Sequence, residues 1–296
     1  MIWEPERSRH QGRIVAALFG RAAGVPARRR LVLSGGPRGA AKDVALEKAG
    51  LDPARYLAVS VDGMLAELAR RSLIPVVAGL APLEAADLVH VEAQHVAKRL
   101  TARAMAAGTN VLLDVTAASW PSVRSWLHVA DLAGYGLDVV MADLGAEAAA
   151  RWADAEHRRG QERYRQGAGD GGRYVPAEAA GAVAALAAAT GERPWSRHIA
   201  HLGRRRPVRF PGGEVVSLIE AYRAGLLSLD DLAGQFQDRP WPAVPPACPP
   251  EAPEAGPAVD DLEPWQPGSF DEVVLACDLG MLGEADYAVL ARAAAG

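Results

Sequence analysis

Two patterns of hydrophobic and polar positions alternate along the first 207 residues of the chain. Short apolar runs recur, and each is followed by a longer stretch with the apolar spacing of an amphipathic helix. The apolar runs predict strands at 31–34, 56–61, 110–114 and 137–142. The stretches between and after them predict helices at 40–50, 62–72, 83–107, 121–134 and 145–165.

Strands separated by helices are typical of βαβ units, so this pattern predicts an α/β fold with a parallel sheet covered by helices on both faces. The run NVLLDV at 110–115 is apolar almost without alternation, as expected for a strand buried on both sides. Ligands of such sheets bind beyond the carboxyl ends of the strands. Ser34, Asp62 and Asp114 fall at or just after predicted strand ends, which predicts a shared site there.

The pattern changes after residue 207, where two short helical segments flank a proline-rich stretch at 240–267. Ten of those 28 residues are proline, which excludes a central strand or a continuous helix and predicts an extended linker. The flanking segments, LIEAYRAGLLSLDDLAGQF and VVLACDLGMLGEADYAVLA, align at an offset of 55 residues. Each predicts a helix, a glycine cap, a turn and a second helix.

The predicted organisation is therefore a domain at 1–207, small helical hairpins at 208–239 and 268–296, and the linker between the hairpins. The similarity of the two hairpins has two interpretations. They form a docking unit, or the similarity is chance in segments rich in Ala and Leu.

Composition and charge narrow the class of protein. A chain of 296 residues, half of them hydrophobic, can bury one sizeable core, and a net charge of −4 gives no overall reason to expect a nucleic acid or an anionic membrane as partner. Arginine triplets at 28–30 and 204–206 are the exceptions. They are either solvated flanks of strands or a phosphate- or nucleic-acid-binding patch.

No apolar run approaches the roughly 20 residues of a membrane helix, and the start MIWEPERSRHQGR does not have the pattern of a secretion signal. The only two cysteines, Cys248 and Cys277, form neither a disulfide framework nor a metal motif. These features predict a cytoplasmic protein.

The strongest candidate for chemistry is SGGPRGAAKD at 34–43, directly after the first apolar run. A phosphate-binding loop reads G-x-x-x-x-G-K-[ST]. Gly36 and Lys42 keep their places in this pattern, whereas Ala41 and Asp43 replace the second glycine and the hydroxyl residue. Backbone N–H groups of such a loop surround phosphate oxygens, and the lysine brings a cation to them. The predicted nucleotide contacts are Gly36, Gly39, Ala40, Ala41, Lys42 and Asp43.

The two replacements predict weakened nucleotide binding, although Asp43 could become an additional oxygen ligand of Mg²⁺. A plain turn before a helix is the alternative interpretation of the loop. It explains the glycines better than it explains a lysine at the start of a helix, where positive charge opposes the helix dipole.

Carboxylates follow the next two predicted strands. Asp62 can act as a general base toward an attacking hydroxyl, or it only caps the helix that follows. Asp114 can hold Mg²⁺, with Thr116 beside it, or this segment only caps the next helix. Both alternatives stay open from the residues alone.

Two further segments carry charged or titratable side chains. His90 and His95 are five residues apart, a spacing that does not place both rings on one helix face, so no metal site is predicted. Residues 155–176 combine arginines with a glycine-rich break. They predict either a mobile lid that brings guanidinium groups to a phosphate, or a solvated helix followed by a flexible loop.

Taken in order, the blocks GGPRGAAK, GLDPARYLAVSVD, ADLVHVEAQHVAKRLTARAMAAGTNVLLDVT and GGRYVP resemble the zeta toxin family of P-loop kinases over about residues 10–180. Family members studied as toxins phosphorylate UDP-N-acetylglucosamine with ATP. The resemblance implies a P-loop kinase-like sheet, ATP and Mg²⁺ as cofactors, a nucleotide sugar as substrate, and an antitoxin or other protein partner.

The resemblance also implies roles for single residues. Lys42 would bind ATP phosphates, and Asp62 would be the base. Arg173, with either Arg158 or Arg163, would stabilise charge. The residues implied on the substrate side are Glu92, Asp114 and Thr116, and the implied magnesium ligands are Asp43 and Asp114.

Departures from the family pattern cluster near the reacting centre. Besides Ala41 and Asp43, Val115 replaces the glycine of a D-G-T motif, and Leu65 stands where a basic residue is usual. Two hypotheses follow: a kinase that phosphorylates a hydroxyl of a small metabolite, or a pseudokinase that acts as a binding module through its C-terminal hairpins. Nucleic-acid binding through the arginine triplets is a third and weaker one.

Overall fold

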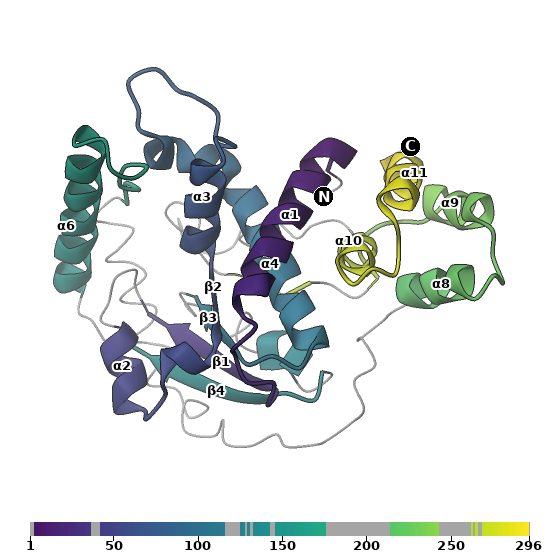
Figure 1. Ribbon diagram of the computed structural model, residues 1–296, viewed down its shortest axis with the longest axis horizontal. Coiled ribbons are helices and arrows are strands. Elements are labelled where there is room, and N and C mark those ends of the chain that lie inside the picture. The colour runs from purple at the N-terminus through teal and green to yellow at the C-terminus, as the bar shows by residue number, and fades with distance from the viewer. Residues whose placement is uncertain are drawn as a thin grey trace, which may run out of the picture.

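The computed structural model describes residues 3–36, 42–115, 125–127, 129–130, 133–142, 146–175, 214–242, 262, 264–265 and 268–295. Figure 1 shows a parallel sheet with helices around it and, beside helix α1 (Pro5–Arg21), a group of C-terminal helices. Among the described residues, no helix has both the length and the apolar character needed to cross a membrane.

The sheet has four strands in the order β2-β3-β1-β4, and all three pairings are parallel. Its strands are β1 (Arg30–Gly35), β2 (Leu57–Ser60), β3 (Val111–Asp114) and β4 (Gly136–Met141). Asp114 lies opposite Ser34 on one side and Ser60 on the other. The carboxyl ends of three strands therefore coincide, which confirms the predicted sheet and places the ends of β1, β2 and β3 at one edge.

Alternate side chains of the strands pack into two different hydrophobic cores, one on each face of the sheet. Leu31 and Leu33 of β1 belong to the larger core, whereas Val32 between them packs with Leu46 and Leu112 in a smaller one on the opposite face. Burial on both faces confirms the prediction made from the unbroken apolar run of β3.

Helices on the two faces come mainly from the stretches predicted to be helical. They are α2 (Lys42–Lys48), α3 (Val61–Arg70), α4 (His90–Ala106) and α6 (Ala146–Arg165), with short 3-10 helices η1 (Pro53–Arg55) and η2 (Pro82–Val89). The helix predicted at 83–107 is in fact divided at residue 90 into η2 and α4. Most of the helix predicted at 121–134 lies outside the described residues.

Helix α1 (Pro5–Arg21) was not predicted from the sequence. Its buried positions are Ser8, Gln11, Ile14 and Val15, so half of its inward face is polar and the helical pattern of apolar residues is weak. The helix packs against α4, where the carboxylate of Glu92 and the guanidinium of Arg99 form hydrogen bonds with the side chain of Gln11.

The C-terminal helices form the two predicted hairpins. The first pairs α8 (Glu214–Arg223) with α9 (Leu229–Gln237), and the second pairs α10 (Asp271–Asp278) with α11 (Glu284–Ala295). Equivalent hydrogen bonds close the first helix of each hairpin at the 55-residue offset: Leu226 N to Ala221 O, and Met281 N to Ala276 O, at 2.9 and 2.7 Å. The repeat is therefore present in the backbone as well as in the sequence.

The side chains that join the hairpins follow the same offset. Residues of the first hairpin and their counterparts 55 positions later are buried in one cluster: Val215, Ile219, Leu232 and Phe236 with Phe270, Val274, Tyr287 and Ala291. Helix α8 packs on α10, and α9 packs on α11. The four helices thus share a single small core built from two copies of one pattern.

A buried ion pair fastens this small bundle to the α/β part. Arg99 of α4 donates from Nε and Nη2 to the two carboxylate oxygens of Asp278, each at 2.7 Å. A second anchor is Trp126, whose Nε1 donates to Leu262 O at 2.6 Å, and both Leu262 and Trp265 lie in the larger core. Residues 243–261 of the predicted linker, with Cys248, lie outside the described residues.

Candidate functional site

The carboxyl edge of the sheet brings together side chains from β1, α2, β3 and α3. Strand β1 ends at Gly35, and Gly36 follows with φ of +123°. A Cβ atom at Gly36 would lie 2.7 Å from Ala142 O, so this position accepts only glycine. Residues 37–41, including Gly39, Ala40 and Ala41, lie outside the described part, and the altered phosphate loop stays a prediction from sequence.

Lys42 opens α2, and its side chain is mostly buried. Its Nζ forms an ion pair with the carboxylate of Asp114 and donates to Val115 O at 3.1 Å. Asp43 follows in the first turn and is exposed. The loop lysine and the carboxylate at the end of β3 are thus brought together from positions 72 residues apart.

Asp62 lies in the first turn of α3, but it is not the cap of that helix. Ser60 is the N-cap, and its Oγ accepts a hydrogen bond from Gly63 N at 2.9 Å. The capping alternative for Asp62 is therefore wrong. Its carboxylate is 42% exposed and accepts a hydrogen bond from Arg173 Nη1 at 3.1 Å.

Arg173 joins Asp62 to a second acidic side chain. Its Nη2 donates to Asp87 Oδ1 at 3.2 Å and lies 3.4 Å from His90 Nδ1. The guanidinium is only 14% exposed, and its three neighbours belong to three different helices. Arg173 is therefore held at the mouth of the site by η2 and by the starts of α3 and α4.

The glycine-rich break before Arg173 packs tightly between α6 and η2. A Cβ atom at Gly172 would lie 2.3 Å from His157 O, and one at Gly160 would lie 2.4 Å from Gly172 Cα. His157 Nδ1 and Gly172 O are 2.8 Å apart. These glycines permit close backbone contact, which neither the lid nor the flexible-loop interpretation predicted.

Residues 64–193 match a protein family model described as Zeta toxin. These residues resemble a zeta toxin domain, and the match spans less than half of the chain. Such a match points to a kinase-like phosphotransferase that binds a nucleotide and acts on a small molecule. No curated protein and no solved structure gives a match.

The match covers part of the site just described. Asp87, Asp114 and Arg173 lie within the matched zeta toxin segment, whereas Lys42 and Asp62 precede its first residue. The contacts of Lys42 with Asp114 and of Arg173 with Asp62 therefore join matched residues to unmatched ones. Lys42 and Asp62 therefore belong to the same site as the matched residues, although the family match does not include them.

Arg158 and Arg163 lie on α6. Arg158 is 71% exposed and pairs with Asp154 one turn away on the same helix, and Arg163 is exposed. Of the three arginines predicted for the zeta toxin domain, Arg173 is the one that contacts Asp62. Roles for Arg158 and Arg163 remain predictions.

Glu92 faces α1. Its buried carboxylate accepts hydrogen bonds from Arg7 Nε and Nη2 at 2.7 and 2.6 Å and from Gln11 Nε2 at 2.8 Å. Arg7 also donates to Leu73 O at 2.8 Å. These bonds hold α1 against α4, and a substrate contact for Glu92 stays a prediction. Thr116 lies outside the described residues.

Two partners of Arg173, Asp87 and His90, were not proposed from the sequence as site residues. Both stand in the block ADLVHVE, which resembles the family, but a continuous helix was predicted there. The break between η2 and α4 places Asp87 and His90 toward Arg173. Neither composition nor helical periodicity carries a signal for that break.

Among the described residues of the site, carboxylates outnumber cations. Lys42 and Arg173 supply two cations, and Asp62, Asp87 and Asp114 supply three carboxylates. Within the described residues no three acidic, His or Cys side chains form a preformed metal site. Asp114 is 51% exposed, so its carboxylate is accessible to Mg²⁺ that arrives with phosphates, the usual mode for this ion.

Proposed function

We propose that this protein transfers the γ-phosphoryl group of ATP to a hydroxyl of a small metabolite, and that a nucleotide sugar such as UDP-N-acetylglucosamine is the first acceptor to test. The observation that carries the proposal is the pair of contacts at the carboxyl edge of the sheet, Lys42 with Asp114 and Arg173 with Asp62. Each joins a cation suited to phosphate with a carboxylate suited to proton or metal binding.

Asp62 is the proposed base. Its partly exposed carboxylate accepts the proton of the acceptor hydroxyl while the hydroxyl oxygen attacks the γ-phosphorus. The bond from the γ-phosphorus to the bridging oxygen breaks, and ADP leaves with the electron pair. Arg173, which donates to Asp62, would stabilise the charge that develops on the transferring group.

Lys42 is the proposed phosphate ligand. Its ammonium exchanges the carboxylate of Asp114 for phosphate oxygens, which releases Asp114. Asp114 and Asp43 would then hold Mg²⁺, which would neutralise part of the charge on the phosphates. The two ion pairs thus hold both cations at the carboxyl edge of the sheet.

The first test is calorimetric titration of the full chain with ATP, with and without Mg²⁺, alongside the variant Lys42→Ala. We expect binding that strengthens with Mg²⁺ and weakens at least about tenfold in the variant. Equal affinity of the two proteins would show that the altered loop is not the nucleotide site.

The second test addresses the base. Asp62→Asn keeps the shape of the side chain but removes its basicity, so we expect ATP binding to persist and phosphoryl transfer to acceptor sugars to fall by about 10²–10⁴-fold. Unchanged turnover in this variant would remove Asp62 from the mechanism.

A pseudokinase is the second candidate function. It is favoured by Ala41 and Asp43 at two working positions of the phosphate loop. In that case the wild-type protein would not bind ATP in the same titration. The partner surface would then be sought on the outer face of the hairpins, because their inner faces pack together and against α1 and α4.

A further inference from the structure

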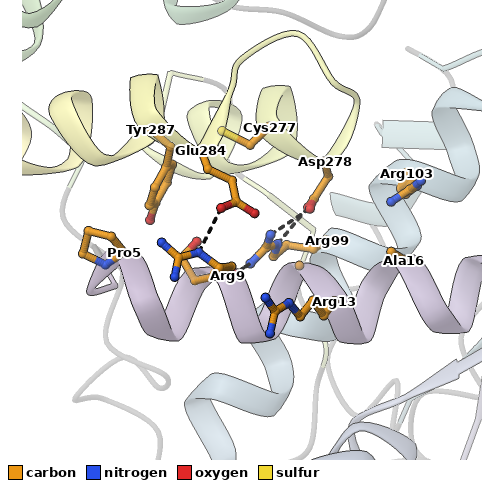
Figure 2. Close-up of a pocket in the computed structure, with 12 residues that line it drawn as sticks. Pro5, Arg9, Arg13, Ala16, Arg99, Arg103, Cys277, Asp278, Glu284 and Tyr287 are labelled. Atoms are coloured by element: carbon orange, nitrogen blue, oxygen red, sulfur yellow. Dashed lines mark hydrogen bonds and ion pairs between the residues drawn. The ribbon is translucent and has the colours of Figure 1, made fainter.

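A second cavity lies away from the sheet edge, where the small C-terminal bundle meets the α/β part. It has a volume of about 270 Å³ and is walled by α1, α4, the end of α10 and the start of α11 (Figure 2). Neither the predicted catalytic residues nor the phosphate loop contributes to its lining.

Two arginine pairs face this cavity, one from each wall of the α/β part. Arg9 and Arg13 are one turn apart on α1, and Arg99 and Arg103 are one turn apart on α4. Like charges at this spacing destabilise a helix, so helix stability does not account for them. Four guanidinium groups around one small cavity give it an excess of positive charge unless carboxylates compensate them.

The bundle supplies half of that compensation. Asp278 binds the buried Arg99 through both carboxylate oxygens, and Glu284 accepts a hydrogen bond from Arg9 Nε at 2.9 Å. Arg99 also donates from Nη1 to Ser8 O and to Gln11 Oε1, so its hydrogen-bonding groups are used. These two pairs form the structural frame of the cavity.

Arg13 and Arg103 are left over. Within the described residues neither side chain has a carboxylate partner, and the guanidinium of Arg103 lies over the ring of Phe19 at 4.9 Å. Tyr287 and the Cys277 thiol add no negative charge near pH 7, and burial raises the pKa of each further, that of Cys277 to about 12. Two positive charges at the cavity are therefore unbalanced.

Small residues keep the cavity open on the α1 side. A Cβ atom at Gly12 would lie 3.1 Å from Arg99 Nη2, so glycine lets that guanidinium lie against the helix. Ala16, one turn further on, presents only a methyl group. The space beside Arg13 is thus not filled by the protein itself.

We propose that this cavity binds a small phosphate monoester. Such a group carries about −1.5 to −2 charges at pH 7, which matches the two unbalanced arginines. Its oxygens accept the paired N–H groups of guanidinium in a bidentate manner. Because Arg13 lies on α1 and Arg103 on α4, the ligand would bridge these two helices, and its binding would raise the melting temperature.

The test is titration of the full chain with inorganic phosphate and with glycerol 3-phosphate, monitored by calorimetry and thermal melting. The variants are Lys42→Ala, which removes the phosphate-loop cation, and Arg13→Gln with Arg103→Gln. Arg151→Gln is the matched control, since Arg151 is an exposed arginine on α6. We expect saturable binding that survives Lys42→Ala and Arg151→Gln but weakens by about tenfold or more in the double variant.

Three results would overturn the proposal. One is unchanged affinity in the double variant, and another is loss of all binding in Lys42→Ala, which would place the phosphate at the sheet edge. The third is equally tight binding of succinate, which would remove the preference for phosphate. If the protein neither binds ATP nor transfers a phosphoryl group, the proposal for the sheet-edge site is wrong. The proposal for this cavity is unaffected by that result.

Discussion

Arg99 and Asp278 are 179 residues apart, and they form a two-bond ion pair in which the side chains are only 6% and 4% exposed. Removal of one partner from such a pair leaves an uncompensated buried charge. Asp278→Ala should therefore lower the free energy of unfolding by about 3–5 kcal/mol, as measured by chemical denaturation. Glu284→Ala is the control, because its pair with Arg9 is largely solvent-exposed and should contribute at most about 1 kcal/mol. Equal losses would contradict the anchoring role of Arg99.

A substitution at Gly172 tests the close packing that positions Arg173. Alanine at this position would place Cβ 2.3 Å from His157 O, and the clash is with backbone. We expect Gly172→Ala to lower the free energy of unfolding by about 1–3 kcal/mol and to reduce phosphoryl transfer. Gly24→Ala is the matched control, since a Cβ atom there meets nothing within 4 Å. A variant that is as stable and active as Gly24→Ala would show that the contact at Gly172 does not hold Arg173 in place.

Substitutions of Arg173 and of Arg158 are expected to differ in their effect on turnover. If Arg173 stabilises the transferring group, Arg173→Ala should reduce turnover about 10³-fold or more. Arg158→Ala should change it less than about threefold, because Arg158 is exposed and pairs along its own helix. Steady-state assays with an identified acceptor measure both, and a larger loss in Arg158→Ala would reverse the assignment.

The buried thiol of Cys277 makes stability depend on pH. Burial raises its pKa to about 12 from a reference value of 9.0. Between those values the unfolded chain releases the proton while the folded chain keeps it, so the free energy of unfolding should decrease as pH rises above about 9. Denaturation at pH 8 and pH 10 measures the effect. Cys277→Ala should reduce the difference between the two pH values, and the same difference in wild type and variant would assign the effect to other groups.

The sheet and its functional edge were the parts most open to prediction. Each strand is a short apolar run, and a side chain at a strand end is placed by the register of a parallel sheet, as Ser34 and Asp114 illustrate. The 55-residue repeat also survives as matched hydrogen bonds at Ala221 and Ala276.

Other contacts join polar groups that are far apart in the sequence, and no local sequence pattern predicts them. Helix α1 was missed because Ser8 and Gln11 occupy half of its buried positions. The carboxylate of Glu92 is used by Arg7, 85 residues earlier in the chain, and no spacing rule predicts that pairing. The break between η2 and α4 contains neither glycine nor proline, so the position of Asp87 could not be anticipated.

The repeated hairpin raises a question of orientation, because two similar copies could compete for the same place beside α4. At the offset of 55 residues, the position of Asp278 corresponds to Arg223 in the first hairpin. An exchange of the two copies would set the guanidinium of Arg223 against that of Arg99 in a buried place, at a high electrostatic cost. A single reversal of charge between otherwise similar copies thus selects one of two assemblies.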